Sequence, residues 1–156
     1  MRALILGLSL WAASPLAAAE ALPAPAFAVM DLSGTAWTQQ GPARGVLLVD
    51  FWASWCPPCL KAIPALNALQ AKYGPTGRLS VLGLCMDKGG QAAAAMTAKK
   101  RGIAYAVAAA DPALATAYKV QGFPSVFVLK GGQVVARLGD PGSLAAFERA
   151  LEPWLK

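Results

Sequence analysis

The stretch Phe51-Trp52-Ala53-Ser54-Trp55-Cys56-Pro57-Pro58-Cys59 lies where an apolar run ends and a helical pattern begins. The run before it, residues 46–51, is apolar at all but one position, which is typical of a strand covered on both faces. After it, apolar residues recur at helical spacing, at Leu60, Ile63, Leu66 and Leu69. We therefore predict a central strand over residues 46–52, followed directly by a helix whose first turn holds the cysteines.

The position of Cys56 and Cys59 at the start of a helix has a chemical consequence. Unpaired N–H groups and the positive end of the helix dipole gather at a helix N-terminus. They stabilise a thiolate, which is the form of cysteine that attacks disulfides. Cys59 stands three positions after Cys56 and is near enough to close a small ring with it. The pair is therefore predicted to be a redox switch.

Other uses of a paired cysteine motif fit this chain less well. A zinc site needs further nitrogen or sulfur ligands, but the chain has no histidine and only one more cysteine, Cys85. Haem attachment needs a histidine directly after the second cysteine, where Leu60 stands. A purely structural disulfide stays open, although such a short loop constrains the unfolded chain little. We expect no metal and no cofactor.

Two further residues in apolar strands call for an explanation. Asp50 interrupts the predicted central strand, and a buried carboxylate is costly without a purpose or a partner. Beneath the cysteines it would have a raised pKa and would shuttle a proton to or from Cys59; the alternative is an aspartate paired with a backbone group or a lysine. Cys85 ends a second apolar strand, where we expect a buried, inert thiol, with a third redox participant as the alternative.

The first residues have the layout of an export signal. Residues 1–19 hold Arg2, an apolar run and Ala17-Ala18-Ala19, so that cleavage is expected after Ala19; an uncleaved N-terminal anchor is the alternative. An exported chain would work in the oxidising periplasm, where a thiol pair is either kept reduced by another protein or used as an oxidant. We expect residues 20–26 to be an extended lead-in and residues 27–156 to form one domain.

Charge gives little support to nucleic-acid binding. The formal net charge is +6, but the basic residues are scattered. Their densest cluster, Lys99-Lys100-Arg101, has no interleaved aromatic residue and is better explained as a solvated helix end.

The rest of the chain alternates between strand and helix patterns. A hairpin is expected over residues 27–38, a helix from Asp111-Pro112 to Tyr118, and a strand pair joined by Gly131-Gly132. The other predicted elements are strands over 79–86 and 103–107, a helix over 91–101, strands over 125–130 and 133–138, and a helix capped by Ser143 that reaches Trp154. This order predicts an α/β fold, a mixed central sheet flanked by helices.

With these elements in place, the chain resembles the exported thiol-disulfide oxidoreductases of the TlpA/ResA/CcmG (DsbE) type, which have the thioredoxin fold. The resemblance covers roughly residues 26–156. It rests on the run 50–59, on Pro64 within the helix, on Gly122-Phe123-Pro124-Ser125 before a strand, and on Gly139. The segment from about 79 to 107 resembles the βα insert that this group carries between the active-site helix and the strand after its cis-proline.

The resemblance implies roles for individual residues. Cys56 would be the nucleophile and Cys59 the resolving thiol of a redox disulfide, next to the proton shuttle inferred above for Asp50. Pro124 would follow a cis peptide bond and face the cysteines, and the backbone at Phe123 would pair with a partner's chain as an added strand. Trp55 and Pro57 would complete the substrate-docking face, and Trp52 would belong to the core.

The chain also departs from the family pattern. Many members have a glutamate where Ala62 stands and an asparagine where Asp50 stands, which weakens a close assignment to the cytochrome c maturation branch. Pro57 and Pro58 remove two N–H groups that would otherwise stabilise the Cys56 thiolate. A less stabilised thiolate indicates that the Cys56–Cys59 pair has a more negative reduction potential and is a better reductant.

These observations predict a periplasmic protein disulfide reductase that acts in cytochrome c maturation or on copper-site and other thiols. The implied partners are a disulfide-containing substrate protein and a membrane electron donor of the DsbD/CcdA type, with the chain itself a monomer. A disulfide oxidase or isomerase of the same fold is one alternative. A copper(I)-binding or redox-inert interaction module is another, which the lack of methionine-rich or histidine-rich tracts disfavours.

Overall fold

The computed structural model describes residues 21–156, so the predicted signal peptide over residues 1–19 lies outside the described part. In chain order the elements are β1 (Leu22–Pro23), β2 (Ala28–Met30), β3 (Ala36–Thr38), β4 (Val46–Trp52), α1 (Pro57–Tyr73), β5 (Leu79–Cys85), α2 (Gly90–Arg101), β6 (Ala106–Ala109), α3 (Pro112–Ala117), β7 (Ser125–Lys130), β8 (Gln133–Leu138), α4 (Leu144–Leu151) and a short 3₁₀ turn (Glu152–Trp154). None of the helices within residues 21–156 is long and apolar enough to cross a membrane.

The main sheet is mixed, as predicted. Its six strands lie in the order β1-β8-β7-β4-β5-β6, and β2 pairs with β3 in a separate hairpin. Strands β4, β5 and β6 are parallel, whereas β7 is antiparallel to β4 and β8 is antiparallel to β7. The carboxyl end of β4 therefore lies beside the start of β7 and the end of β5. The segments that follow β4 and β5 and the segment that precedes β7 thus meet at the same end of the sheet, the end where β4 finishes.

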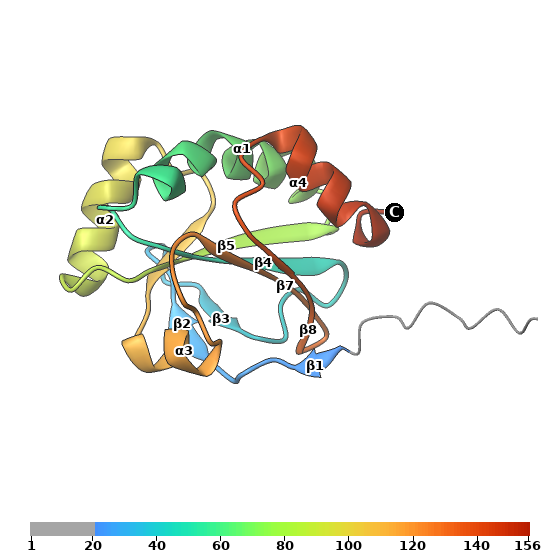
Figure 1. Ribbon diagram of the computed structural model, residues 1–156, viewed down its shortest axis with the longest axis horizontal. Helices are drawn as coiled ribbons and strands as arrows, with labels where there is room; N and C mark the ends of the chain where they lie inside the picture. Colours follow the sequence, from blue (N-terminus) through green and yellow to red (C-terminus); the bar gives the residue numbers. More distant parts are fainter. Residues whose placement is uncertain (1–20) are drawn as a thin grey trace, which may run out of the picture.

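Helices cover both faces of the sheet, which explains why β4 is buried at every position. Figure 1 shows α1, α2 and α4 on one face, with α3 and the β2–β3 hairpin on the other. Alternate residues of β4 supply the two cores: Leu48 and Trp52 pack beneath α1, whereas Val49 and Phe51 pack toward α3. Asp50 therefore shares the α1 face with Trp52.

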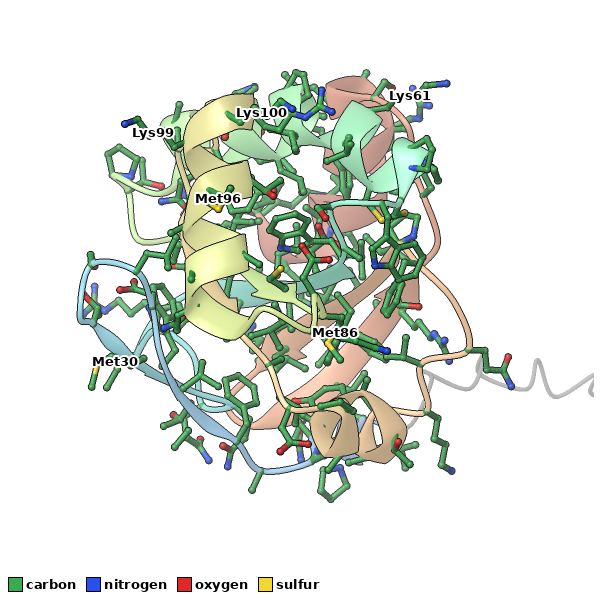
Figure 2. The ribbon with its side chains drawn as sticks, turned by 90° about the vertical axis from the view of Figure 1, so that its left-hand side faces the viewer. Met30, Lys61, Met86, Met96, Lys99 and Lys100 are labelled. Carbon is green, nitrogen blue, oxygen red and sulfur yellow. A yellow bond between two sulfur atoms is a disulfide. The ribbon has the colours of Figure 1, made fainter. Side chains whose placement is uncertain are left out.

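The hairpin and α2 lie on the same side of the molecule (Figure 2), and several long side chains of that side are exposed. Met30 on β2 is 54% exposed and Met96 on α2 is 74% exposed. Lys99 and Lys100 occupy the last turn of α2, where cations interact favourably with the helix dipole. Their exposure agrees with the reading of this cluster as a solvated helix end.

Two predicted boundaries were wrong. The strand expected over 103–107 lies instead at Ala106–Ala109, because Asn67 of α1 holds the preceding segment as a loop. Its side chain donates to the Gly102 carbonyl at 2.8 Å and accepts from the N–H of Ala104 at 2.7 Å. The last α-helix ends at Leu151 and gives way to the 3₁₀ turn, since Pro153 has no N–H to continue α-helical bonding.

Candidate active site

The junction between β4 and α1 places Cys56 at the N-cap of the helix. Its backbone is extended, and its N–H donates to the Ala53 carbonyl at 3.1 Å, which closes a tight turn after the strand. Pro57 and Pro58 occupy the first helical positions, where an N–H has no partner within the helix. The sequence thus sets the start of α1 at the cysteine pair, as predicted.

Cys56 and Cys59 form a disulfide, with their Cα atoms 5.3 Å apart. The backbone N–H of Cys59 donates to Sγ of Cys56 at 3.3 Å. Both residues are almost completely covered, at 4% and 2% exposed. The Cys59 N–H thus donates a hydrogen bond to the sulfur that would be the nucleophile according to the family resemblance.

Two aromatic side chains lie next to the disulfide, at the end of the sheet where β4 finishes. Trp55, directly before Cys56, is 68% exposed, and its ring centroid lies 5.7 Å from that of Phe123 in an edge-on arrangement. Phe123 lies at this end of the sheet because it precedes β7, which runs antiparallel to β4. The Phe123–Pro124 peptide bond is cis, as the resemblance implied. Pro57 is exposed in the same region.

Trp52 and Cys85 belong to the core rather than to this surface. Trp52 is 1% exposed, and Cys85, opposite it in the register of β4 and β5, is 0% exposed and free. Burial raises the pKa of the Cys85 thiol to about 11. Both observations support the prediction of an inert thiol.

Asp50 is buried, at 1% exposed, and its Oδ1 has no hydrogen-bond partner within residues 21–156. Burial, and after it the negative charge of Asp140, raises the pKa of Asp50 to about 7. Its neighbours along β4 on the same face, Leu48 and Trp52, belong to the cluster that contains Cys59. The geometry therefore places a carboxyl that can change its charge near neutral pH on the Cys59 side of the sheet.

Two acids at the site were not singled out from the sequence. Asp87 follows β5, and its carboxylate accepts from the N–H of Ser54, two residues before Cys56, at 3.1 Å to Oδ1. Asp140 follows β8 and is the exposed acid whose charge reaches Asp50. Asp87 and Asp140 each come just after a strand that finishes at the same end of the sheet as β4. That position relative to the strand ends is the signal that would have found them.

Comparisons with known proteins agree with this geometry. A family model described as Redoxin matches residues 19–145. A thioredoxin of Staphylococcus aureus is 33% identical over 94 residues, which are 60% of this chain and 67% of that protein. A thiol:disulfide interchange protein of the thioredoxin family from Chlorobium tepidum has a crystal structure with 28% identity and a TM-score of 0.73, covering 88% of this chain and 99% of that one.

A fold likeness extends to more distant proteins. StoA from Bacillus subtilis is 17% identical, with a TM-score of 0.70 over 85% of this chain and 98% of that one.

The family match spans most of the chain and includes the Cys56–Cys59 pair. The chain therefore belongs to the redoxin family, as a thiol-disulfide oxidoreductase of thioredoxin fold.

Proposed function

We propose that the chain is an exported protein disulfide reductase that works through a mixed disulfide at Cys56. The observation that carries the proposal is the Cys56–Cys59 disulfide in the first turn of α1, beside the exposed ring of Trp55. The layout of residues 1–19 supports export, and the proposed compartment is the periplasm. The substrates would be proteins with a disulfide to be opened, such as an apocytochrome c or a copper-site protein.

Reduction of the substrate takes two exchange steps. The Cys56 thiolate attacks one sulfur of the substrate disulfide, and the other substrate sulfur leaves as a thiolate. Cys59 then loses its proton and attacks Sγ of Cys56, which breaks the mixed disulfide and releases the second substrate sulfur. The substrate gains two electrons, and the chain ends as the Cys56–Cys59 disulfide. A membrane donor of the DsbD/CcdA type would return two electrons to the pair.

Asp50 would accept the proton of Cys59 in the second step. A carboxyl with a pKa of about 7 takes up and returns a proton at neutral pH with little free-energy cost. The unpartnered Oδ1 leaves one oxygen free for this task. We therefore assign Asp50 the role of general base during resolution and of general acid when the disulfide is reopened.

Trp55, Pro57, Phe123 and Pro124 would form the surface that receives the substrate. Aromatic rings with large exposed area are frequent anchors of protein contacts, and Trp55 is such a ring. The backbone at Phe123 precedes β7 and would pair with an extended segment of the substrate. The substrate disulfide would then lie over Cys56.

A trapping experiment tests the proposal. Reduced Cys59→Ser protein is mixed with a protein that carries one exposed disulfide, and adducts are detected by mass spectrometry without reductant. We expect a mixed disulfide at Cys56 that dithiothreitol reverses, and no adduct with the matched Cys56→Ser variant. The absence of any adduct, together with no substrate reduction by the unaltered chain, would leave the redox-inert interaction module as the better account.

A further inference from the structure

A cavity of about 410 Å³ lies between the β2–β3 hairpin and the outer edge of the sheet. Its walls include Asp31 and Trp37 from the hairpin, Gln70 from α1, and Ile103 and Tyr105 from the segment before β6. Tyr105 itself is buried, at 7% exposed. One side of this tyrosine therefore borders a cavity at the molecular surface.

The other side of Tyr105 borders the surroundings of Asp50. Gly83 of β5 stands opposite Asp50 in the parallel register, and it has no side chain. A Cβ placed on Gly83 would lie 2.9 Å from Nε1 of Trp52 and 3.0 Å from Cε2 of Tyr105. The two rings thus occupy the space that a side chain at position 83 would fill. Both rings belong to the core cluster on the face of the sheet that carries Asp50.

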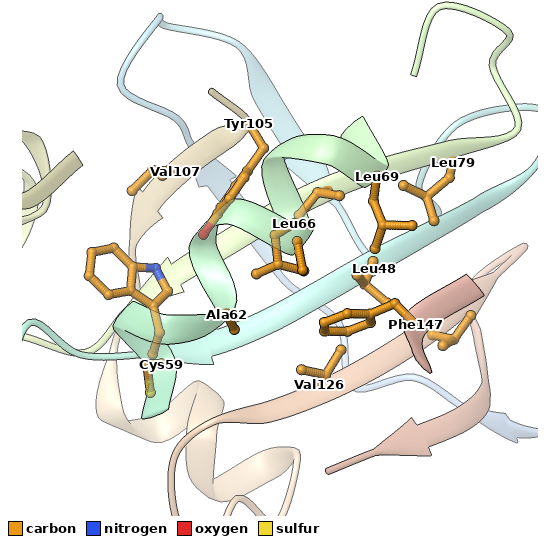
Figure 3. Close-up of a cluster of buried hydrophobic side chains, with 14 of the residues drawn as sticks. Leu48, Cys59, Ala62, Leu66, Leu69, Leu79, Tyr105, Val107, Val126 and Phe147 are labelled. Carbon is orange, nitrogen blue, oxygen red and sulfur yellow. The ribbon is translucent and has the colours of Figure 1, made fainter. Parts of the chain in front are cut away.

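The side chain of Tyr105 points toward α1 (Figure 3). Figure 3 shows its side chain extending from the sheet edge toward α1, with the hydroxyl end near the helix that carries Ala62 and Leu66. Burial, and after it the charge of Asp50, raises the pKa of the Tyr105 phenol, so this side chain stays neutral beside the carboxyl. The Tyr105 ring therefore has the cavity on one side and, on the other, the position of Gly83, which pairs with Asp50.

We propose that Tyr105 is a positioning residue for Asp50, whose ring shuts the surface cavity off from the buried carboxyl and so keeps water away from the proton acceptor. The inference rests on the proposed role of Asp50. Water that reached the carboxyl would stabilise its charged form. Asp50 would then hold its negative charge at lower pH and be a weaker base for Cys59.

Several other groups near Asp50 carry or can acquire charge. Cys59 comes from α1, Cys85 from β5 and Asp140 from the segment after β8, whereas β7 presents Val126 and Val128 on this face. In the oxidised protein Cys59 does not titrate, and the raised pKa of Cys85 keeps it neutral at neutral pH. Asp140 is the remaining charge that acts on Asp50. The oxidised protein therefore isolates the effect of Tyr105.

The test is a pH titration of the Asp50 carboxyl carbon by NMR in the oxidised chain. Tyr105→Leu removes the ring, and we expect the acid dissociation constant of Asp50 to rise by about tenfold or more. Tyr105→Phe keeps the ring and should titrate like the unaltered chain. The matched control is Tyr118→Leu, which removes a tyrosine that is 4% exposed in the cluster on the opposite face. It should leave the Asp50 titration unchanged.

Tyr105→Val gives a second route if Tyr105→Leu does not fold, because a β-branched side chain suits the extended segment next to β6. It also removes the ring, so Asp50 should again titrate at lower pH. An unchanged Asp50 titration in the folded variants would overturn the role of Tyr105, as would an equal change with Tyr105→Phe. The titration needs no substrate, so a failure of the reductase proposal is detected separately, by the trapping experiment with Cys59→Ser.

Discussion

The backbone N–H of Cys59 donates to Sγ of Cys56 at 3.3 Å, and it is the first N–H that α1 has to offer. The two positions between them are Pro57 and Pro58, which have none. An N-cap side chain usually accepts from the second or third helical residue. The Cys56 sulfur therefore has one of its two usual backbone donors.

Restoring the second donor should make the pair more oxidising. Pro58→Ala adds an N–H at the second helical position, where it can reach the Cys56 thiolate. A hydrogen bond to a charged group contributes about 1.5 kcal/mol, which corresponds to a reduction potential about 30 mV less negative. Equilibration with a glutathione buffer measures this change. Pro57→Ala is the control, because its N–H at the first position does not reach the cap; an equal change in both variants would contradict the explanation.

Trp55 should matter for substrate proteins but not for stability. Because its ring is 68% exposed, Trp55→Ala should leave the free energy of unfolding nearly unchanged. Loss of an aromatic anchor should lower kcat/KM for a protein disulfide by about tenfold, or about 1.4 kcal/mol. Met96→Ala, at a site 74% exposed on α2, is the matched control and should have no effect. Full activity of Trp55→Ala would remove this ring from the docking surface.

Asp50 should make the protein less stable as pH rises. Its pKa in the folded protein is about 7, against 3.8 for the ordinary group, so the folded state holds the proton more tightly between these values. Stability is therefore lost as pH rises from about 4 to 7, by roughly 4 kcal/mol in all.

Asp50→Asn should lack this loss. Urea unfolding of the oxidised protein should find the variant more stable than the unaltered chain at pH 8, with a difference that shrinks toward pH 4. Asp111→Asn, which changes an exposed capping aspartate on α3, controls for the general effect of removing an acid. Parallel stability curves for Asp50→Asn and the unaltered chain would show that Asp50 is not the source of the pH dependence.

Cys85 should be unreactive in the folded, reduced protein. It is 0% exposed, and burial raises its thiol pKa to about 11, so little thiolate forms at neutral pH. Alkylation followed by peptide mass mapping should modify Cys56 readily and Cys85 only after denaturation. Cys85→Ala should retain full reductase activity. Labelling of folded Cys85 as fast as Cys56 would instead make it a third redox participant.

Much of the fold could be predicted from the sequence because its signals are local. The run over β4 and the spacing along α1 located the junction that carries the cysteines, and Gly131-Gly132 located the β7–β8 hairpin. The disulfide partners are three residues apart, so that their proximity depends on one turn of helix. These features are set by neighbouring residues along the chain.

The parts that could not be predicted depend on contacts between distant segments. Asn67 shifts β6 by bonding across to Gly102 and Ala104. Asp87 reaches Ser54 over 33 positions, and Tyr105 meets Gly83 only because β5 and β6 are adjacent. A single sequence carries no local signal for such pairs. They are the residues that surround the site rather than those that make up the cysteine motif.

The reduction potential of the Cys56–Cys59 pair tests the reductase proposal most directly. The oxidised and reduced chain is equilibrated with glutathione or dithiothreitol, and the fraction of each is measured by thiol alkylation. With one backbone donor at Cys56, we predict a value near that of thioredoxin, about −270 mV, which suits a reductase supplied by a membrane donor. A value near about −120 mV, as in the oxidant DsbA, would contradict the proposal and make the chain a disulfide oxidase.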